Sequence, residues 1–140
     1  MKPIRILYVC VHNAGRSQMA EALTNHLARQ RGLAVVAESA GTVGGKGLNP
    51  LAVQALAEIG VSMEGQAPKL MTPEMVEGAD RVISMGCGVD ADACPVRFIL
   101  AEDWGLDDPA GRSMDEVNRI RDEIRAKVEN LLAEVESKCC

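Results

Sequence analysis

The stretch VCVHNAGRSQMAE, Val9 to Glu21, decides the fold, because an apolar run changes in it to a loop of small residues and then to helix-forming residues. The apolar run IRILYVC, at residues 4–10, is typical of a buried parallel strand. From Ser17 to about Arg31 apolar side chains recur at helical spacing, and Gly32 suits a helix C-cap. The stretch therefore predicts a strand, a loop and a helix in succession, with Cys10 at the strand's end.

The same alternation of strands and helices continues along the 140-residue chain. Further strands are predicted at 34–40, 80–85 and 96–100, further helices at 50–59, at 73–78 and from Ser113 onward, and loops at 86–95 and 102–111. Pro50, the N-cap Thr72 and the capping box formed by Ser113 and Glu116 mark the three helix starts. We expect an α/β fold: one domain over 1–140, with a four-stranded parallel sheet, helices on both faces and a flexible tail at 136–140.

Charge and composition argue against several classes of partner. The net charge is −5, the basic residues are scattered, and the chain has one Trp, one Tyr and one Phe, so it lacks the features of a nucleic-acid binder. No apolar run approaches the roughly 20 residues that span a bilayer, and residues 1–10 read as a strand and not as a signal peptide. We expect a monomeric cytoplasmic protein without nucleic-acid or membrane partners.

The chain contains five cysteines, Cys10, Cys87, Cys94, Cys139 and Cys140. An odd number in a cytoplasmic chain does not indicate a disulfide framework. Zinc sites usually combine Cys-x-x-Cys pairs, which this chain lacks, so no metal site is predicted from the cysteines. Reactive thiols are the remaining interpretation.

The loop after Cys10 has the composition of an oxyanion site. Backbone N–H groups at a helix start attract anions, and the planar fork of Arg16 can hold two oxygens of a tetrahedral anion. The same positive surroundings lower the pKa of a thiol, so Cys10 is predicted to be a nucleophilic thiolate with Ser17 as a hydrogen-bond donor. A buried cysteine beside a capped helix is the alternative. The predicted oxyanion-binding residues are Val11, His12, Asn13, Ala14, Gly15, Arg16 and Ser17.

The stretch CVHNAGRSQMAE resembles the anion-binding loop of the low-molecular-weight tyrosine phosphatases. The resemblance implies their fold and a chemistry in which Cys10 attacks, Arg16 clamps the anion and Asp108, before Pro109, acts as general acid. The neighbouring Asp107 could be confused with that acid. Ala110 stands where the phosphatases tend to place an aromatic residue, which weakens the prediction of an aryl-phosphate substrate.

With CVHNAGRSQMAE, the stretches ESAG, GCGVDADACP, EDWGLDDPAG and RIRDEI make nearly the whole chain similar to thioredoxin-coupled arsenate reductases. The resemblance implies that Cys10 attacks arsenate, that Cys87 then forms a disulfide with Cys10 and releases arsenite, and that Cys94 takes over the disulfide with Cys87, which thioredoxin reduces. A helix would hold the thiols of Cys87 and Cys94 about 10 Å apart, so their loop is predicted to change conformation.

Other functions remain open at this stage. A hydrolytic phosphatase acting on phosphate monoesters needs Cys10, Arg16 and Asp108 but not Cys87 and Cys94. A redox-sensing protein without turnover is a third hypothesis, against which the intact catalytic set argues. By the same resemblance Asn13, Glu21 and Ser39 would line a potassium site. No role follows for Cys139 and Cys140.

Overall fold

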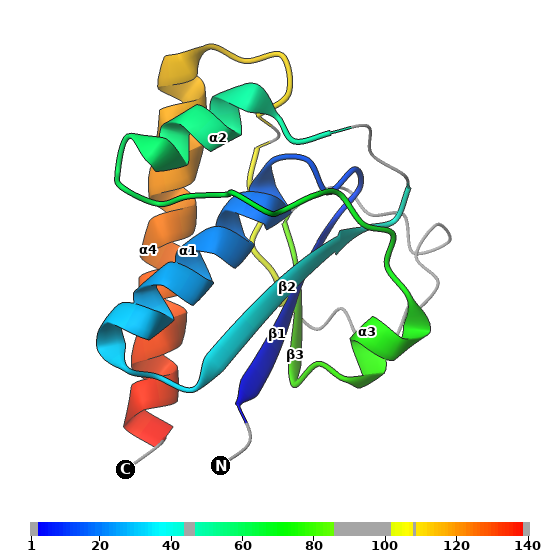
Figure 1. Ribbon diagram of the computed structural model, residues 1–140, viewed down its shortest axis with the longest axis vertical. Coiled ribbons are helices and arrows are strands. Elements are labelled where there is room, and N and C mark those ends of the chain that lie inside the picture. Colours follow the sequence, from blue (N-terminus) through cyan, green and yellow to red (C-terminus); the bar gives the residue numbers. More distant parts are fainter. Residues whose placement is uncertain (1–2, 44–46, 86–101, 108, 139–140) are drawn as a thin grey trace.

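The computed structural model describes residues 3–43, 47–85, 102–107 and 109–138 (Figure 1). Strands and helices alternate along most of the chain, as the sequence predicts. The elements are β1 (Ile4–Cys10), α1 (Arg16–Arg31), β2 (Val35–Gly41), α2 (Pro50–Ala57), α3 (Pro73–Glu77), β3 (Arg81–Ser84), β4 (Glu102–Asp103) and α4 (Met114–Lys138). Gly32 ends α1 in the left-handed conformation, as expected of a C-cap glycine.

The described strands form one parallel sheet in the order β2-β1-β3-β4. The chain therefore moves outward from β1 in opposite directions, first to β2 and later to β3. In parallel sheets a ligand binds beyond the carboxyl ends of the strands where the order reverses in this way. Cys10, the last residue of β1 and the partner of Gly41 in register, stands at that position.

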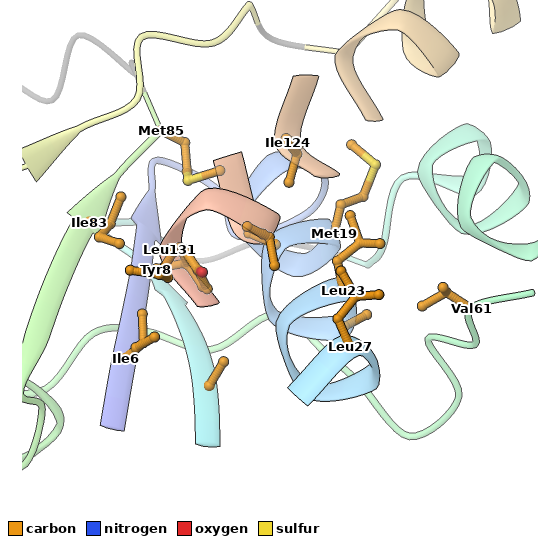
Figure 2. Close-up of a cluster of buried hydrophobic side chains, with 14 of the residues drawn as sticks. Ile6, Tyr8, Met19, Leu23, Leu27, Val61, Ile83, Met85, Ile124 and Leu131 are labelled. Atoms are coloured by element: carbon orange, nitrogen blue, oxygen red, sulfur yellow. The ribbon is translucent and has the colours of Figure 1, made fainter. Parts of the chain in front are cut away.

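Helices cover both faces of the sheet, so the predicted fold class is confirmed (Figure 1). On one face α1 and α4 pack over the apolar cluster that contains Ile6 and Tyr8 of β1, together with residues of α2 (Figure 2). On the other face α3 packs over Leu7 and Val9. This division follows from the two-residue period of a strand, which sends neighbouring side chains of β1 to opposite faces. Each large side chain so buried stabilises the fold by about 1.5–3 kcal/mol.

Tyr8 joins β1 to α1 within the first cluster. Its hydroxyl lies 2.7 Å from the hydroxyl of Thr24 on α1, and its ring stacks at a tilt against Trp104, with centroids 5.3 Å apart. Burial raises the pKa of Tyr8 far above its ordinary value, so the phenol stays neutral. The strand that ends in Cys10 is thereby held to the helix that follows it.

The fourth strand differs from the prediction. Residues 96–100, predicted as that strand, lie outside the described residues, whereas Glu102 and Asp103, predicted as loop, form β4 beside β3. Both residues of β4 are acidic, so hydrophobic periodicity does not predict this strand. Polar contacts hold it in place instead. Glu102 pairs with Arg81 of β3, and Ser84 donates a hydrogen bond to the carboxylate of Asp103 at 2.8 Å.

The last helix is longer than the predicted boundary of the tail allows. α4 continues through Lys138, so residues 136–138 are helical and not part of a tail, while Cys139 and Cys140 lie outside the described residues. Val117, Ile120 and Ile124 bury one face of this helix, at the spacing that predicted it. None of the helices in the described ranges is long and apolar enough to cross a membrane.

Candidate active site

The loop between β1 and α1 forms the centre of the candidate site. Backbone hydrogen bonds tie it to the segment after β2: Thr42 N–H donates to the carbonyl of Cys10 at 3.1 Å, and Asn49 N–H donates to that of Ala14 at 2.8 Å. Gly41 allows this close approach, since a Cβ there would lie 2.7 Å from the carbonyl oxygen of Val11. The loop is therefore held on a rigid support of strand and neighbouring chain.

Cys10 as a residue is 4% exposed, and its thiol lies within hydrogen-bond distance of two polar groups. Its Sγ is 2.8 Å from Ser17 Oγ and accepts the backbone N–H of Asn13 at 3.2 Å. Hydrogen bonds of this kind favour the charged form of a group, and so does the start of a helix. The structure thus brings Cys10 and Ser17 together as the sequence predicts.

Arg16 is buried, and its guanidinium connects three parts of the chain. Nη1 donates to the carbonyls of Met85, which follows β3, and of Leu106, which follows β4, at 3.2 and 2.7 Å. The predicted clamp is therefore anchored from behind by backbone oxygens, which limits the rotamers available to its long side chain. Such anchoring orients the planar fork before an anion arrives.

A pocket of about 190 Å³ lies over this loop. Its lining consists of Cys10, Val11, His12, Ala14, Gly15, Arg16, Asn49, Pro109 and Ala110. Five of the seven predicted oxyanion-binding residues thus line it. Asn13 and Ser17 are fully buried behind it, where Asn13 directs its N–H toward Cys10 and its side chain toward Ser17. The pocket therefore lies directly beside the thiol of Cys10 and the guanidinium of Arg16.

Gly15 has a steric role at this site. Its φ is −128°, a value open to other residues, but a Cβ on it would lie 2.8 Å from Cγ of Pro109. The residue that takes the left-handed conformation is Asn13, with φ of 54°. Gly15 therefore lets Pro109 lie against the start of α1.

The predicted general acid, Asp108, lies outside the described residues, but its neighbours lie at the site. Pro109 and Ala110 line the pocket, and the carboxylate of Asp107 pairs with Arg119 of α4 at 3.1 Å. The hydrogen bonds that Arg119 donates to the carboxylates of Asp107 and Glu123 raise the pKa of its guanidinium. Asp107 is thus engaged with α4, and the role of Asp108 as general acid stays a prediction.

Cys87 and Cys94, the two predicted relay thiols, also lie outside the described residues. The described residue just before them, Met85, is buried, and its N–H donates to the carbonyl of Val9 at 3.1 Å. The backbone carbonyl of Met85 also accepts a hydrogen bond from Arg16, so the described chain before these cysteines ends beside the loop that follows Cys10. The relay itself stays a prediction.

The residues predicted for potassium do not fit an ion held by all three of them. Asn13 Oδ1 already accepts the N–H of Lys69 and an N–H of Gln18, both at 2.9 Å. Ser39 donates to the carboxylate of Glu21 at 2.7 Å, and the ammonium of Lys69 lies 4.0 Å from the same carboxylate. Burial raises the pKa of Glu21, while Ser39 and Lys69 oppose that rise. A cation of the chain thus occupies this region, and no chemical step is assigned to potassium.

Sequence reasoning missed two kinds of residue at this site. Asn49 enters the lining from 33 positions beyond Arg16 and caps α2. Gln18 and Gln66 form a hydrogen-bonded chain behind Asn13. One signal could have pointed to Gln18. It is a polar residue directly before Met19, which is buried on α1, and a buried polar residue usually has a specific hydrogen-bonding role.

Both the sequence and the structure of this chain are similar to those of known proteins. The family model described as low molecular weight phosphotyrosine protein phosphatase matches residues 5–139. Arsenate reductase 1 of Staphylococcus epidermidis is 34% identical over 131 residues, which cover 92% of this chain and 96% of that protein. The glutaredoxin arsenate reductase of Synechocystis sp. is 31% identical over 132 residues, 94% of this chain and 98% of that one. A solved arsenate reductase in the phosphate binding state is 31% identical, with TM-score 0.80 over 96% of this chain and 98% of that chain.

Proposed function

The chain belongs to the low molecular weight phosphotyrosine protein phosphatase family, and we propose that it is an enzyme of that family which reduces arsenate to arsenite. The observation that carries the proposal is the surroundings of Cys10: a thiol beside Ser17 and Arg16 in a pocket for a small tetrahedral anion. Similarity to arsenate reductases over nine-tenths of the chain supports this choice of anion.

In the first step the Cys10 thiolate attacks the arsenic of dihydrogen arsenate. A sulfur–arsenic bond forms, one arsenic–oxygen bond breaks, and the departing oxygen leaves as water after it takes up a proton. Asp108 supplies that proton in our proposal. Arg16 and the N–H groups of residues 11–17 stabilise the charge on the remaining oxygens.

In the second step the thiolate of Cys87 attacks the sulfur of Cys10. A disulfide forms, the sulfur–arsenic bond breaks and its electron pair stays on arsenic, so arsenic(V) becomes arsenic(III) and leaves as arsenite. The thiolate of Cys94 then attacks Cys87, which forms the Cys87–Cys94 disulfide and returns the Cys10 thiolate. A dithiol protein, thioredoxin in our proposal, supplies the two electrons and two protons that reduce this disulfide.

The first test is arsenate-dependent oxidation of NADPH with thioredoxin and thioredoxin reductase, run beside glutaredoxin with glutathione and its reductase. We expect turnover with thioredoxin. Hydrolysis of p-nitrophenyl phosphate is measured on the same sample. Hydrolysis without arsenate-dependent oxidation by either donor would overturn the reductase proposal, and turnover with glutaredoxin alone would reassign the electron donor.

The relay has its own test. Cys94→Ser should stop after one turnover with Cys10 and Cys87 joined, which mass spectrometry of the digested protein detects. A Cys139→Ser variant is the matched control and should turn over repeatedly. Continued turnover of the Cys94→Ser variant with thioredoxin would show that Cys94 is not the final thiol.

A phosphatase is the second candidate, because the contacts of Cys10 with Ser17 and Asn13 serve a phosphocysteine equally well. Water would then cleave the phosphorus–sulfur bond, and no further thiol is needed. Ala110 lines the pocket and offers no aromatic surface for an aryl ester. We therefore rank hydrolysis of phosphate monoesters below arsenate reduction.

A further inference from the structure

A buried chain of three amide side chains runs behind the pocket, from Asn13 through Gln18 to Gln66. Gln18 is 0% exposed although it lies on the first turn of α1, where an apolar side chain would bury at lower cost. A buried amide without hydrogen bonds costs about 1–3 kcal/mol. Each of the three amide side chains has hydrogen-bond partners, and these partners determine which end of each amide donates and which accepts.

Backbone groups fix the orientation of the two glutamines, because a carbonyl can only accept and an N–H can only donate. Gln18 Nε2 lies 3.0 Å from the carbonyl oxygens of both Asn13 and Ala67, so this end of the amide must be the NH₂ group. Gln66 Nε2 donates to the carbonyl of Gln18 at 3.1 Å and to Gln18 Oε1 at 2.7 Å. The pair cannot flip without placing oxygen against oxygen.

The orientation of Asn13 follows from the same argument. Its Oδ1 accepts from the backbone N–H of Lys69 and from Gln18 Nε2, both at 2.9 Å. Its Nδ2 must then face Ser17 Oγ, to which it donates at 2.8 Å. A flipped Asn13 would set its oxygen against the serine and its NH₂ against two donors.

Ser17 has one hydroxyl hydrogen. Because its oxygen accepts from Asn13, that hydrogen can point to Cys10 Sγ, 2.8 Å away. If Asn13 presented its oxygen instead, the serine hydrogen would go to the asparagine. The sulfur would then lose a donor that favours its charged form.

We propose that Gln18, held by Gln66 and the carbonyl of Ala67, is a positioning residue that keeps Asn13 donating to Ser17 and Ser17 donating to the Cys10 thiolate. The connection between α2 and α3, which carries residues 66–69, thereby acts on the nucleophile from outside the pocket. The inference rests on the proposed function only in taking Cys10 as the nucleophile.

The ionisable side chains near Cys10 stay in place when Gln18 or Gln66 is substituted. Among the described residues of the pocket, His12 and Arg16 carry ionisable side chains, and Glu21 with Lys69 lie beyond Asn13. None of these four is altered by substitution of Gln18 or Gln66. A change in the titration of Cys10 can therefore be assigned to the amide chain.

The test follows the alkylation of Cys10 by iodoacetamide between pH 5 and 9, approximately the range in which protein thiols titrate, with peptide mass spectrometry to separate Cys10 from the other cysteines. Gln18→Met removes the amide but keeps the length, and Gln30→Met, an exposed position on the same helix, is the matched control. We expect Gln18→Met to raise the midpoint of Cys10 alkylation by about one pH unit, as the loss of one hydrogen bond to a charged group implies. Gln30→Met should leave it unchanged.

An unchanged midpoint in a folded Gln18→Met variant would overturn the proposal and make Gln18 a packing residue. Should the Gln18→Met variant not fold, Gln66→Met is measured instead, because Gln66 is the amide of the three farthest from Cys10 along the hydrogen-bonded chain. A rise in the alkylation midpoint of less than about one pH unit supports the proposal, and no rise overturns it. Alkylation does not require turnover, so the outcome is independent of whether the chain reduces arsenate. If the wild-type Cys10 titrates like an ordinary thiol, the nucleophile assignment itself fails.

Discussion

The start of α1 differs from the starts of the other described helices in what occupies its first N–H groups. Side-chain oxygens cap three helices from the position just before each of them: Asn49 for α2, Thr72 for α3 and Ser113 for α4. α1 begins after Gly15, and no described side chain caps it. Instead the pocket, the Cys10 sulfur and Arg16 lie at that end.

This difference separates a structural helix end from one available to a ligand. The first N–H groups of a helix lack partners inside it, and they either find a local acceptor or remain available to an anion. Three helix starts follow the first course in this chain. At α1 the small residues Ala14 and Gly15 line the pocket, and Cys10, the proposed nucleophile, lines the same space.

The largest effect should come from removing Cys10, the proposed nucleophile, at the uncapped start of α1. Cys10→Ser should lower both arsenate reduction and any phosphatase activity by at least about 10³-fold, because serine is not ionised at neutral pH. Initial rates with both substrates measure this. Phosphate should still raise the melting temperature of the variant, since Arg16 and the loop N–H groups remain. Activity near that of the wild type would show that α1 does not carry the chemistry.

A smaller effect should follow from a methyl group at Gly15. In Gly15→Ala the new Cβ would lie 2.8 Å from Pro109 Cγ, so Pro109 or the start of α1 must shift. A shift of this kind moves the residue next to the proposed general acid, Asp108, and we expect kcat/KM to fall about 10- to 100-fold. Gly47→Ala is the matched control, because nothing lies within 4 Å of a Cβ there. Equal activity of the two variants would remove the role assigned to the close approach of Pro109.

The sheet and its helices were predictable because apolar periodicity records burial. Ile6 and Tyr8 alternate with Leu7 and Val9, so a parallel strand with two covered faces follows from β1 alone. β4 escaped prediction for the opposite physical reason. Glu102 takes its place through an ion pair with Arg81 and through backbone pairing, and neither leaves an apolar pattern.

The same contrast applies to the site. Cys10, Arg16 and Ser17 lie within one short stretch, and their spacing alone places them around one point. Gln66 meets Gln18 across 48 positions, and a glutamine in a connecting segment has the composition of a solvated loop. Contacts of this kind depend on tertiary packing, which local sequence does not encode.

A capped helix start should affect stability and not activity. Thr72→Ala removes the oxygen that accepts the N–H of Met75 at the start of α3, on the face of the sheet away from α1. We expect a loss of about 1 kcal/mol in the free energy of unfolding and unchanged kcat/KM. Urea denaturation and initial rates measure the two quantities. A drop in activity larger than about twofold would show that the two kinds of helix start are coupled.

The smallest effect concerns the ammonium group of Lys69, which lies near the start of α1 that no described side chain caps. Lys69 places its ammonium 4.0 Å from Glu21 Oε1, and its backbone N–H bonds Asn13, so the chain supplies charge and hydrogen bonds where an ion would stand. Replacement of potassium chloride by sodium or choline chloride at equal concentration should change the initial rate by less than about twofold, because the ionic strength, and with it the screening of charges, stays the same. Lys69→Met keeps the backbone N–H and removes the ammonium, and its rate should then depend more on potassium than that of the wild type. A strong potassium dependence of the wild-type rate would contradict this assignment and restore Glu21 and Ser39 as ligands.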